Sequence, residues 1–320
     1  MNRSFSKGIM YTLLSSLCIA FMGVAMKEGS ANVSDSMILF FRTLIPFIAL
    51  LFFINSISFK QIGQDFKIHL LRALTAMIGQ FAYIACINQA SIFEATLLYY
   101  TGPLFIPVLA RIFYKKPMNL KMVLSIIIGF IGVALVAHPD SGHFNSAILL
   151  GLFSGFAMAV SQVCNYGLTS DSHYINNVFA LYGLGSIVCL IPLVVDFIMG
   201  TAFSGTNNNA SGLNLSWFIL LMAFILPGLL SLGNQALRDL SYRQVENPGH
   251  LSPFMFSAVV FSAILEFIIF AKVPNALAWG GMVLITLSSI LIMFARSDKK
   301  CEGGESPQER LPQKSGAVRL

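Results

Sequence analysis

The side chains that could do chemistry in this sequence are uncharged polar groups placed inside long apolar stretches. The clearest stripe is Ser154, Met158, Ser161 and Asn165, at intervals of four, three and four residues, with Gln162 alongside. Such intervals put side chains on one face of an α-helix. Hydroxyl and amide groups on one face can line a cavity for a polar ligand, or they can hydrogen-bond to a neighbouring helix. Both interpretations are open for this stripe.

A second apolar stretch carries two amide side chains after a proline. Asn234 and Gln235 follow Pro227, which lacks the N–H that would satisfy a carbonyl one turn earlier in a helix. A freed carbonyl is tolerated inside a membrane where it faces protein or a cavity. We therefore expect Asn234 and Gln235 to line the pathway of a ligand.

Aromatic rings share helical faces with polar groups in two neighbouring stretches. Gln80 and Tyr83 fall on one face, and Tyr99 or Tyr100 falls on a face with Thr96. Rings and amides together could stack on and orient a planar or amphipathic metabolite. The tyrosines could instead belong to the aromatic belt of a membrane interface, and both interpretations are open.

Three charged residues lie within or at the ends of apolar stretches, where charge is costly unless it has a partner. Arg42 could hold an anionic group of a substrate, or it could pair with Glu94 or Glu28. Glu266 could bind a cationic group or carry a coupling proton, and its position also suits a role at a helix end. Glu94 opens an expected helix, where a carboxylate complements the helix N-terminus.

Enzymatic, metal-binding and nucleic-acid-binding functions find no support in the sequence. The five histidines are scattered, no pair of the five cysteines has metal or redox spacing, and no phosphate-binding glycine loop or nucleophile elbow occurs. The net charge of +6 comes from basic residues in loops and at helix ends, not from a patch interleaved with aromatics. We expect no catalytic residue, no metal, no cofactor and no nucleic-acid partner.

The elements that must position these side chains are membrane-spanning helices. The chain is 56% hydrophobic and 11% charged, against about 25% charged in soluble domains. Each span needs roughly 20 apolar residues. The predicted fold is therefore all-α and integral to a membrane, with ten transmembrane helices at 8–26, 36–54, 70–88, 92–113, 120–137, 147–168, 176–198, 215–235, 251–270 and 276–295.

Charges in the connecting loops predict the orientation of these helices. With the N-terminus inside, the outer side keeps only Lys27 and Lys272 as basic residues, and the others fall on the inner side. This asymmetry follows the positive-inside rule and predicts a multi-pass protein of the cell inner membrane with both termini in the cytoplasm. Residues 297–320 are polar and are expected to form a disordered cytoplasmic tail.

The two halves of the chain resemble each other. Pro103 lies 13 residues before Lys116, and Pro253 lies 13 residues before Glu266, each in a helix followed by a proline-containing turn. Residues 8–137 and 147–295 therefore predict two repeats. Five helices per repeat is an odd number, so the repeats must be inverted relative to each other. Inverted repeats are typical of transporters, in which one half rocks against the other around a midplane site.

The sequence resembles the EamA-type carriers of the drug/metabolite transporter superfamily. The resemblance covers about residues 8–295 and rests on the five-plus-five plan, on Phe40-Phe41-Arg42, on a fourth helix with Ala95 and Pro103, and on Gly129-Phe130-Ile131-Gly132. Where the family usually has Gly-Glu at the end of the fourth helix, this chain has Lys115-Lys116. The pair Phe41-Arg42 with Leu71-Arg72-Ala73-Leu74 is similar to the group that takes up S-adenosylmethionine.

From these features we predict a secondary transporter that moves a small organic metabolite by alternating access. Its partners would be a small-molecule substrate, the lipid bilayer and a coupling proton or ion, and a homodimer stays open. The alternatives are an S-adenosylmethionine importer of the same family and a non-transporting membrane scaffold. The substrate-binding residues we expect are Gln80, Tyr83, Tyr99, Tyr100, Ser161, Gln162, Asn165, Asn234 and Gln235, with Arg42 and Glu266 as charge partners.

Overall fold

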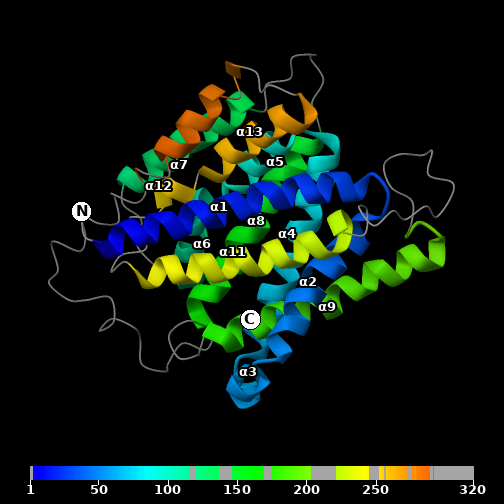
Figure 1. Ribbon diagram of the computed structural model, residues 1–320. Coiled ribbons are helices and arrows are strands. Elements are labelled where there is room, and N and C mark those ends of the chain that lie inside the picture. Colours follow the sequence, from blue (N-terminus) through cyan, green and yellow to red (C-terminus); the bar gives the residue numbers. More distant parts are fainter. Residues whose placement is uncertain are drawn as a thin grey trace, which may run out of the picture.

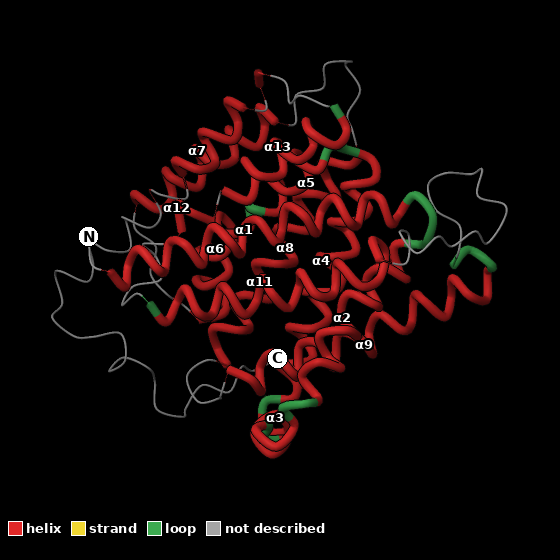
Figure 2. The backbone as a smooth tube through the Cα atoms, viewed as in Figure 1, coloured by secondary structure: helices red, strands yellow, loops and turns green. Residues whose placement is uncertain are grey.

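The computed structural model is all-helical over the residues that it describes (Figure 1). These are residues 3–114, 120–136, 146–168, 174–202, 221–244, 252–255, 257–271, 276–277, 279–288 and 291. Figure 2 shows long helices joined by short loops over this part of the chain, without a strand. The predicted tail at 297–320 lies outside the described residues.

The helices of the first half follow the apolar stretches of the sequence. They are α1 (Arg3–Ser30), α2 (Asp35–Leu51), the short α3 (Phe59–Gln64), α4 (Phe66–Gln89), α5 (Ile92–Tyr99), α6 (Gly102–Tyr114) and α7 (Leu120–Val136), with a single 3-10 turn at Ile54–Ser56. Most starts and ends lie within four residues of the predicted spans. The sequence did not predict α3, which is too short to span a membrane.

The second half begins with two long helices. The elements are α8 (Ser146–Leu168), α9 (Tyr174–Met199), a π-helical turn at Leu221–Ile225, α11 (Leu226–Arg243), α12 (Ser252–Met255) and α13 (Ser257–Phe270). A short apolar helix, Trp279–Ser288, follows within the last predicted span. The predicted start of the eighth helix at 215 lies outside the described residues.

Five of the described helical segments are long and apolar enough to cross a membrane. They are Ser6–Ser30, Phe66–Gln89, Ile92–Phe113, Ala147–Asn165 and Ile175–Met199. Large apolar side chains face outward on many helices, and Ile198 is 77% exposed and Ile268 is 69% exposed. Contiguous apolar exposure is unusual for a soluble monomer and suits a surface covered by lipid.

The fourth predicted span, 92–113, agrees with the apolar helical segment Ile92–Phe113, and the helix is interrupted within it. A turn at Tyr100 and Thr101 separates α5 from α6. Pro103 has no N–H to donate to the carbonyl of Tyr99, so the helical hydrogen bonds cannot continue through this point. The hydroxyl of Thr101 donates to the carbonyl of Leu98 at 2.6 Å and satisfies another backbone group there.

The eighth helix ends later than predicted. Hydropathy placed its end at 235, but α11 continues to Arg243. Arg238 and Asp239, expected in a polar connection, are therefore helical. A helix needs only backbone hydrogen bonds to continue, and its residues need not stay apolar once the chain leaves the apolar region.

The most extensive contacts join helices from different halves of the chain. α4 packs on α8, α1 on α11, and α2 on α9, while α13 packs on both α1 and α5. In Figure 1 the blue α1 and the yellow α11 run side by side across the molecule. Helices of both halves therefore surround the space at the centre.

Candidate functional site

A cavity at the centre of the helices is lined by polar side chains from both halves. Its walls come from α1, α2, α4, α5, α8, α9 and α11, and its polar lining is Arg42, Thr43, Arg72, Gln80, Tyr83, Tyr99, Ser161, Gln162, Tyr182, Ser231, Asn234, Gln235 and Arg238. Its volume is about 70 Å³. One water molecule needs about 10–15 Å³, and pockets for drug-sized ligands are about 300–1,000 Å³. In this conformation the cavity has room for a few waters.

Arg42, Gln80 and Tyr99 form a chain of hydrogen bonds along the wall of the cavity. An Nη1–H of Arg42 donates to Oε1 of Gln80, and Nε2 of Gln80 donates to the hydroxyl of Tyr99 at 3.2 Å. Arg42 is 7% exposed. Because the amide oxygen of Gln80 accepts from the arginine, its amide nitrogen must face the tyrosine, which fixes the orientation of the amide.

The expected ion pair between Arg42 and Glu94 or Glu28 is not formed. Glu94 instead completes a capping box at the start of α5: its carboxylate accepts from the N–H of Ser91 at 3.2 Å, and the Ser91 hydroxyl accepts from the N–H of Glu94 at 3.0 Å. This outcome agrees with the helix-end role expected for Glu94. Arg42 donates to Gln80 and lines the cavity instead.

Tyrosine rings form one side of the cavity. The rings of Tyr83 and Tyr99 lie with centroids 5.2 Å apart and planes tilted by 49°. The hydroxyls of Tyr83 and Thr96 lie 3.0 Å apart, within hydrogen-bond distance. These contacts leave a partly aromatic wall beside the amide of Gln80.

The amides and hydroxyls of the second half line the cavity and also bond to neighbouring helices. The Ser15 hydroxyl of α1 donates to Oδ1 of Asn234 at 2.6 Å. The Ser161 hydroxyl of α8 donates to the carbonyl of Arg72 at 3.2 Å. Gln162 and Gln235 line the cavity beside them. The two interpretations of the polar stripe on α8 are therefore compatible.

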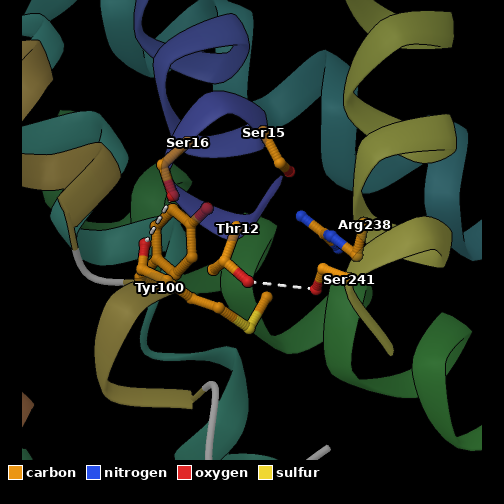
Figure 3. A pocket seen from close by; sticks show the side chains of 7 residues that line it. Thr12, Ser15, Ser16, Tyr100, Arg238 and Ser241 are labelled. Atoms are coloured by element: carbon orange, nitrogen blue, oxygen red, sulfur yellow. Dashed lines mark hydrogen bonds between the residues drawn. The ribbon is translucent and has the colours of Figure 1, made fainter. Parts of the chain in front are cut away.

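Two of the predicted residues do not line this cavity. Asn165 lines neither the central cavity nor the smaller one beside it. Tyr100 lines a smaller one, about 10 Å³ in volume, together with Thr12, Ser15, Ser16, Arg238, Ser241 and Met255 (Figure 3). The turn between α5 and α6 directs the side chains of Tyr99 and Tyr100 to different places.

Five polar residues of the cavity were not among the site residues expected from the sequence, namely Thr43, Arg72, Tyr182, Ser231 and Arg238. Arg72 was assigned to the inner end of its helix, but its side chain is 6% exposed and donates to the carbonyl of Asn177 at 3.1 Å. The hydroxyls of Tyr182 and Ser231 lie 2.9 Å apart and join α9 to α11. In the sequence, Tyr182 is followed at a helical interval by Ser186 alone. Two polar residues are too few to mark a polar face on this helix.

Glu266 lies outside the cavity and holds together three helices. Its carboxylate accepts from the N–H groups of Ile92 and Phe93 at 3.0 and 2.9 Å, and Nζ of Lys27 lies 3.5 Å away. The carboxylate therefore caps the N-terminus of α5 from α13, which is the helix-end role considered from the sequence. Glu266 is 1% exposed.

The described residues contain no group of three or more His, Cys, Asp and Glu side chains that could hold a metal ion. Within the same part of the chain, no carboxylate lines the central cavity. The lining offers guanidinium groups, amides, hydroxyls and aromatic rings. Such a set can bind and orient a small polar molecule by hydrogen bonds and stacking.

Comparison with known proteins finds transporters that are similar to this chain. The model of the EamA-like transporter family matches residues 6–137. The chain is 20% identical to the pseudopaline exporter CntI of Pseudomonas aeruginosa (strain UCBPP-PA14), over 89% of this chain and 95% of that protein. It is 23% identical to the S-adenosylmethionine uptake transporter of Rickettsia felis, over 93% and 95% of the two chains.

A third relative is the riboflavin transporter of Brucella anthropi, which is 24% identical over 72% of this chain and 77% of that protein. A solved structure described as "Crystal structure of protein" superposes with a TM-score of 0.53 over 92% of this chain and 98% of that chain. Its sequence identity is 14%, so this likeness shows the fold alone. The resemblance to EamA-type carriers of the drug/metabolite transporter superfamily is confirmed.

Proposed function

Because residues 6–137 carry an EamA-like transporter domain in a multi-pass membrane protein, we propose that the chain is a secondary transporter. It would move a small organic metabolite across the cell inner membrane by alternating access. The observation that carries this proposal is the central polar cavity, to which both halves of the chain contribute side chains. A cavity between two halves can open to either side when the halves rock against each other.

The small volume of the cavity fits a contracted state of such a cycle. About 70 Å³ cannot hold an organic metabolite, so the helices around the cavity must separate before one enters. The walls that must separate are pairs such as α1 with α11, whose contact joins the two halves. Loading and release would then follow from the same movement in opposite directions.

Helix contacts support the proposal of two inverted repeats. If the two halves are exchanged, α1 is replaced by α8, α2 by α9, α4 by α11, and α5 with α6 by α12 with α13. The contact of α4 with α8 then becomes that of α11 with α1, and the contact of α1 with α13 becomes that of α8 with α5 and α6. Contacts of α4 with α9 and of α11 with α2 are related in the same way. A duplicated five-helix unit would give this pattern.

Two other functions are weighed against this one. An S-adenosylmethionine importer is suggested by the names of the Rickettsia relatives, and the tyrosines of the cavity could stack on an adenine ring. A non-transporting membrane scaffold would have no need of amides and arginines gathered in a cavity, because polar groups inside a bilayer are costly. The gathered groups therefore favour transport over a scaffold.

Counterflow in proteoliposomes tests the proposal. Vesicles carrying the purified protein are loaded with unlabelled amino acids, nucleosides or S-adenosylmethionine, and the uptake of the labelled compound is followed. We expect saturable uptake of at least one compound, and a loss of at least about 5-fold in the variant Gln162→Leu, which removes hydrogen-bonding groups from the cavity. The variant Gln64→Leu on α3, exposed and outside the cavity, should leave uptake unchanged. An absence of saturable uptake by folded protein would contradict the proposal.

The proposed orientation has a separate test. Single cysteines at Lys60 and Asn208, in a chain without its native cysteines, should react with an impermeant maleimide from opposite sides of the membrane. Labelling of both from the same side would contradict the ten-helix topology with cytoplasmic termini.

A proton gradient imposed on the vesicles of the counterflow experiment tests whether a proton is the coupling ion. A proton-coupled carrier concentrates its substrate only when the gradient is present.

A further inference from the structure

Resting on the proposed transport function, we propose that the substrate is an organic anion with a planar ring, held through its carboxylate or phosphate by Arg42. The cavity is lined by three arginines, Arg42, Arg72 and Arg238, and by no carboxylate of the described residues. A guanidinium group stays protonated under all ordinary conditions. Arg42 therefore presents a positive charge to whatever enters the site.

Arg42 carries most of the argument. Its side chain is 7% exposed, and the partners that the structure gives it are the amide oxygen of Gln80 and the sulfur of Met26, at 3.9 Å from Nη1. Both partners are neutral. A charged group buried inside a membrane protein is costly unless an opposite charge offsets it. An anion in the cavity would supply the opposite charge that these two partners of Arg42 do not.

The nearby carboxylates are engaged elsewhere. Glu266 accepts from two backbone N–H groups of α5 and lies 3.5 Å from Lys27. Glu94 closes the capping box of α5, and Asp35 accepts from Nδ2 of Asn88 at 2.8 Å. None of the three lines the cavity. The positive charge there is thus not neutralised by these groups.

The ring of the substrate is inferred from the wall beside Arg42. Tyr83 and Tyr99 present their rings next to the amide of Gln80, and the hydroxyl of Tyr99 accepts from that amide. Since the hydrogen bond uses an acceptor site of the Tyr99 oxygen, its own O–H can be donated to a ligand. A flat ring stacked here would place an attached anionic group within reach of Arg42.

Two matched sets of probes test the inference in the proteoliposomes already described. The first is indole-3-acetate, indole-3-acetamide and tryptamine, which share a ring and differ in charge. The second is adenosine 5′-monophosphate and adenosine, which separate a phosphate from a carboxylate as the recognised group. We expect saturable counterflow of the anion of at least one set, at least about 10-fold more efficient than that of its uncharged partner.

Variants then connect the effect to the residue. Arg42→Gln should lower the efficiency for the anion by about 10- to 100-fold, Arg42→Lys should keep part of it, and Arg111→Gln on the exposed face of α6 should keep all of it. The comparison of probes in the unaltered protein needs no variant, so a poorly folding Arg42→Gln does not remove the test. Saturable transport that prefers uncharged or cationic compounds, S-adenosylmethionine included, would overturn the inference and leave the transport function standing. No saturable transport of any compound would overturn both.

Discussion

The hydroxyl of Tyr99 ends the chain of hydrogen bonds that orients Gln80 against Arg42. Replacing Tyr99 by Phe keeps the ring and removes the acceptor, so the amide of Gln80 loses one fixed partner. A hydrogen bond of this kind contributes about 1 kcal/mol, or about 5-fold in binding. We predict that Tyr99→Phe raises the KM for the transported substrate by about 5- to 10-fold, measured as initial rates of uptake.

Tyr100→Phe is the matched control for that measurement. Tyr100 is the next residue along the chain, carries the same side chain, and lines the smaller cavity instead of the central one. Its change should alter the KM by less than about 2-fold. Equal effects of the two changes would mean that the tyrosines act through general packing and not through the orientation of Gln80.

Glu266 illustrates a charged residue that is structural. Changing it to Ala leaves the N–H groups of Ile92 and Phe93 buried without this acceptor and removes the carboxylate that pairs with Lys27. We predict a loss of about 2–4 kcal/mol in the free energy of unfolding, because both a helix cap and a buried ion pair disappear. Thermal unfolding of the protein in detergent, followed by circular dichroism, measures the loss.

A comparison with Glu28 shows whether this loss belongs to the contacts of Glu266. Glu28 is also a carboxylate in an apolar helix, but its side chain makes no hydrogen bond or ion pair in the described part of the chain. Glu28→Ala should change the stability by less than about 0.5 kcal/mol. Glu266→Gln keeps one oxygen acceptor and should lie between the two alanine variants.

Close approach of backbones is the feature that fixes α8 among its neighbours. A Cβ atom added at Gly155 would lie 2.7 Å from Oγ1 of Thr101 and 2.8 Å from the carbonyl oxygen of Leu98. Gly151 lies one turn earlier on the same face, and small residues spaced by four are typical of tight helix packing in membranes. The turn between α5 and α6 lies directly against this glycine face.

We therefore predict that Gly155→Ala destabilises the protein by about 1–3 kcal/mol, because backbone atoms must move to admit the methyl group. Gly280→Ala is the control, since nothing lies within 4 Å of a Cβ added there. That change should be neutral or slightly stabilising, because alanine favours the helix. The melting temperatures of the two variants in the same detergent decide the matter, and a lower value for Gly280→Ala would refute the packing argument.

At the level of helices, the sequence predicted what depends on hydropathy and little of what depends on neighbours. Long apolar runs predicted the helices from α1 to α9 apart from the short α3, with α5 and α6 as a single span, because each span must satisfy its backbone polar groups within itself. The end of α11 at Arg243 escaped prediction because polar residues continue a helix as readily as apolar ones. The interruption at Tyr100 and Thr101 was signalled by Pro103, but a proline inside a span can also kink a helix without breaking it.

The site followed the same division. Spacing by three placed Gln80 with Tyr83 and placed Met158 with Ser161, and each pair lines the cavity. Asn165 lies on the same stripe but does not line the cavity. The spacing of polar residues does not show how far along a helix a cavity extends. Arg72 looked like an orientation signal because arginines at helix ends usually are. Only the packing of α4 against α8 and α9 shows that its side chain points inward.

The contact of α1 with α11 is, after that of α4 with α8, the most extensive one between the two halves of the molecule. Near one end of this contact, beside the smaller cavity, the hydroxyl oxygens of Thr12 and Ser241 lie 3.0 Å apart (Figure 3). Arg238 lines both this small cavity and the central one, so the contact closes one end of the space around the arginine. If the halves rock against each other, this contact must open during every cycle.

A covalent link at that contact should therefore stop transport without preventing folding. We predict that Thr12→Cys with Ser241→Cys, in a chain freed of its native cysteines, loses at least about 10-fold of its uptake rate when oxidised. A reductant should restore it, because only the disulfide holds α1 against α11. Either cysteine alone is the control and should transport equally in both conditions. A shifted mobility on a gel shows that the protein is fully linked. If the linked protein transports as fast as the protein treated with reductant, α1 and α11 need not separate. Alternating access by rocking of the halves would then have to be abandoned.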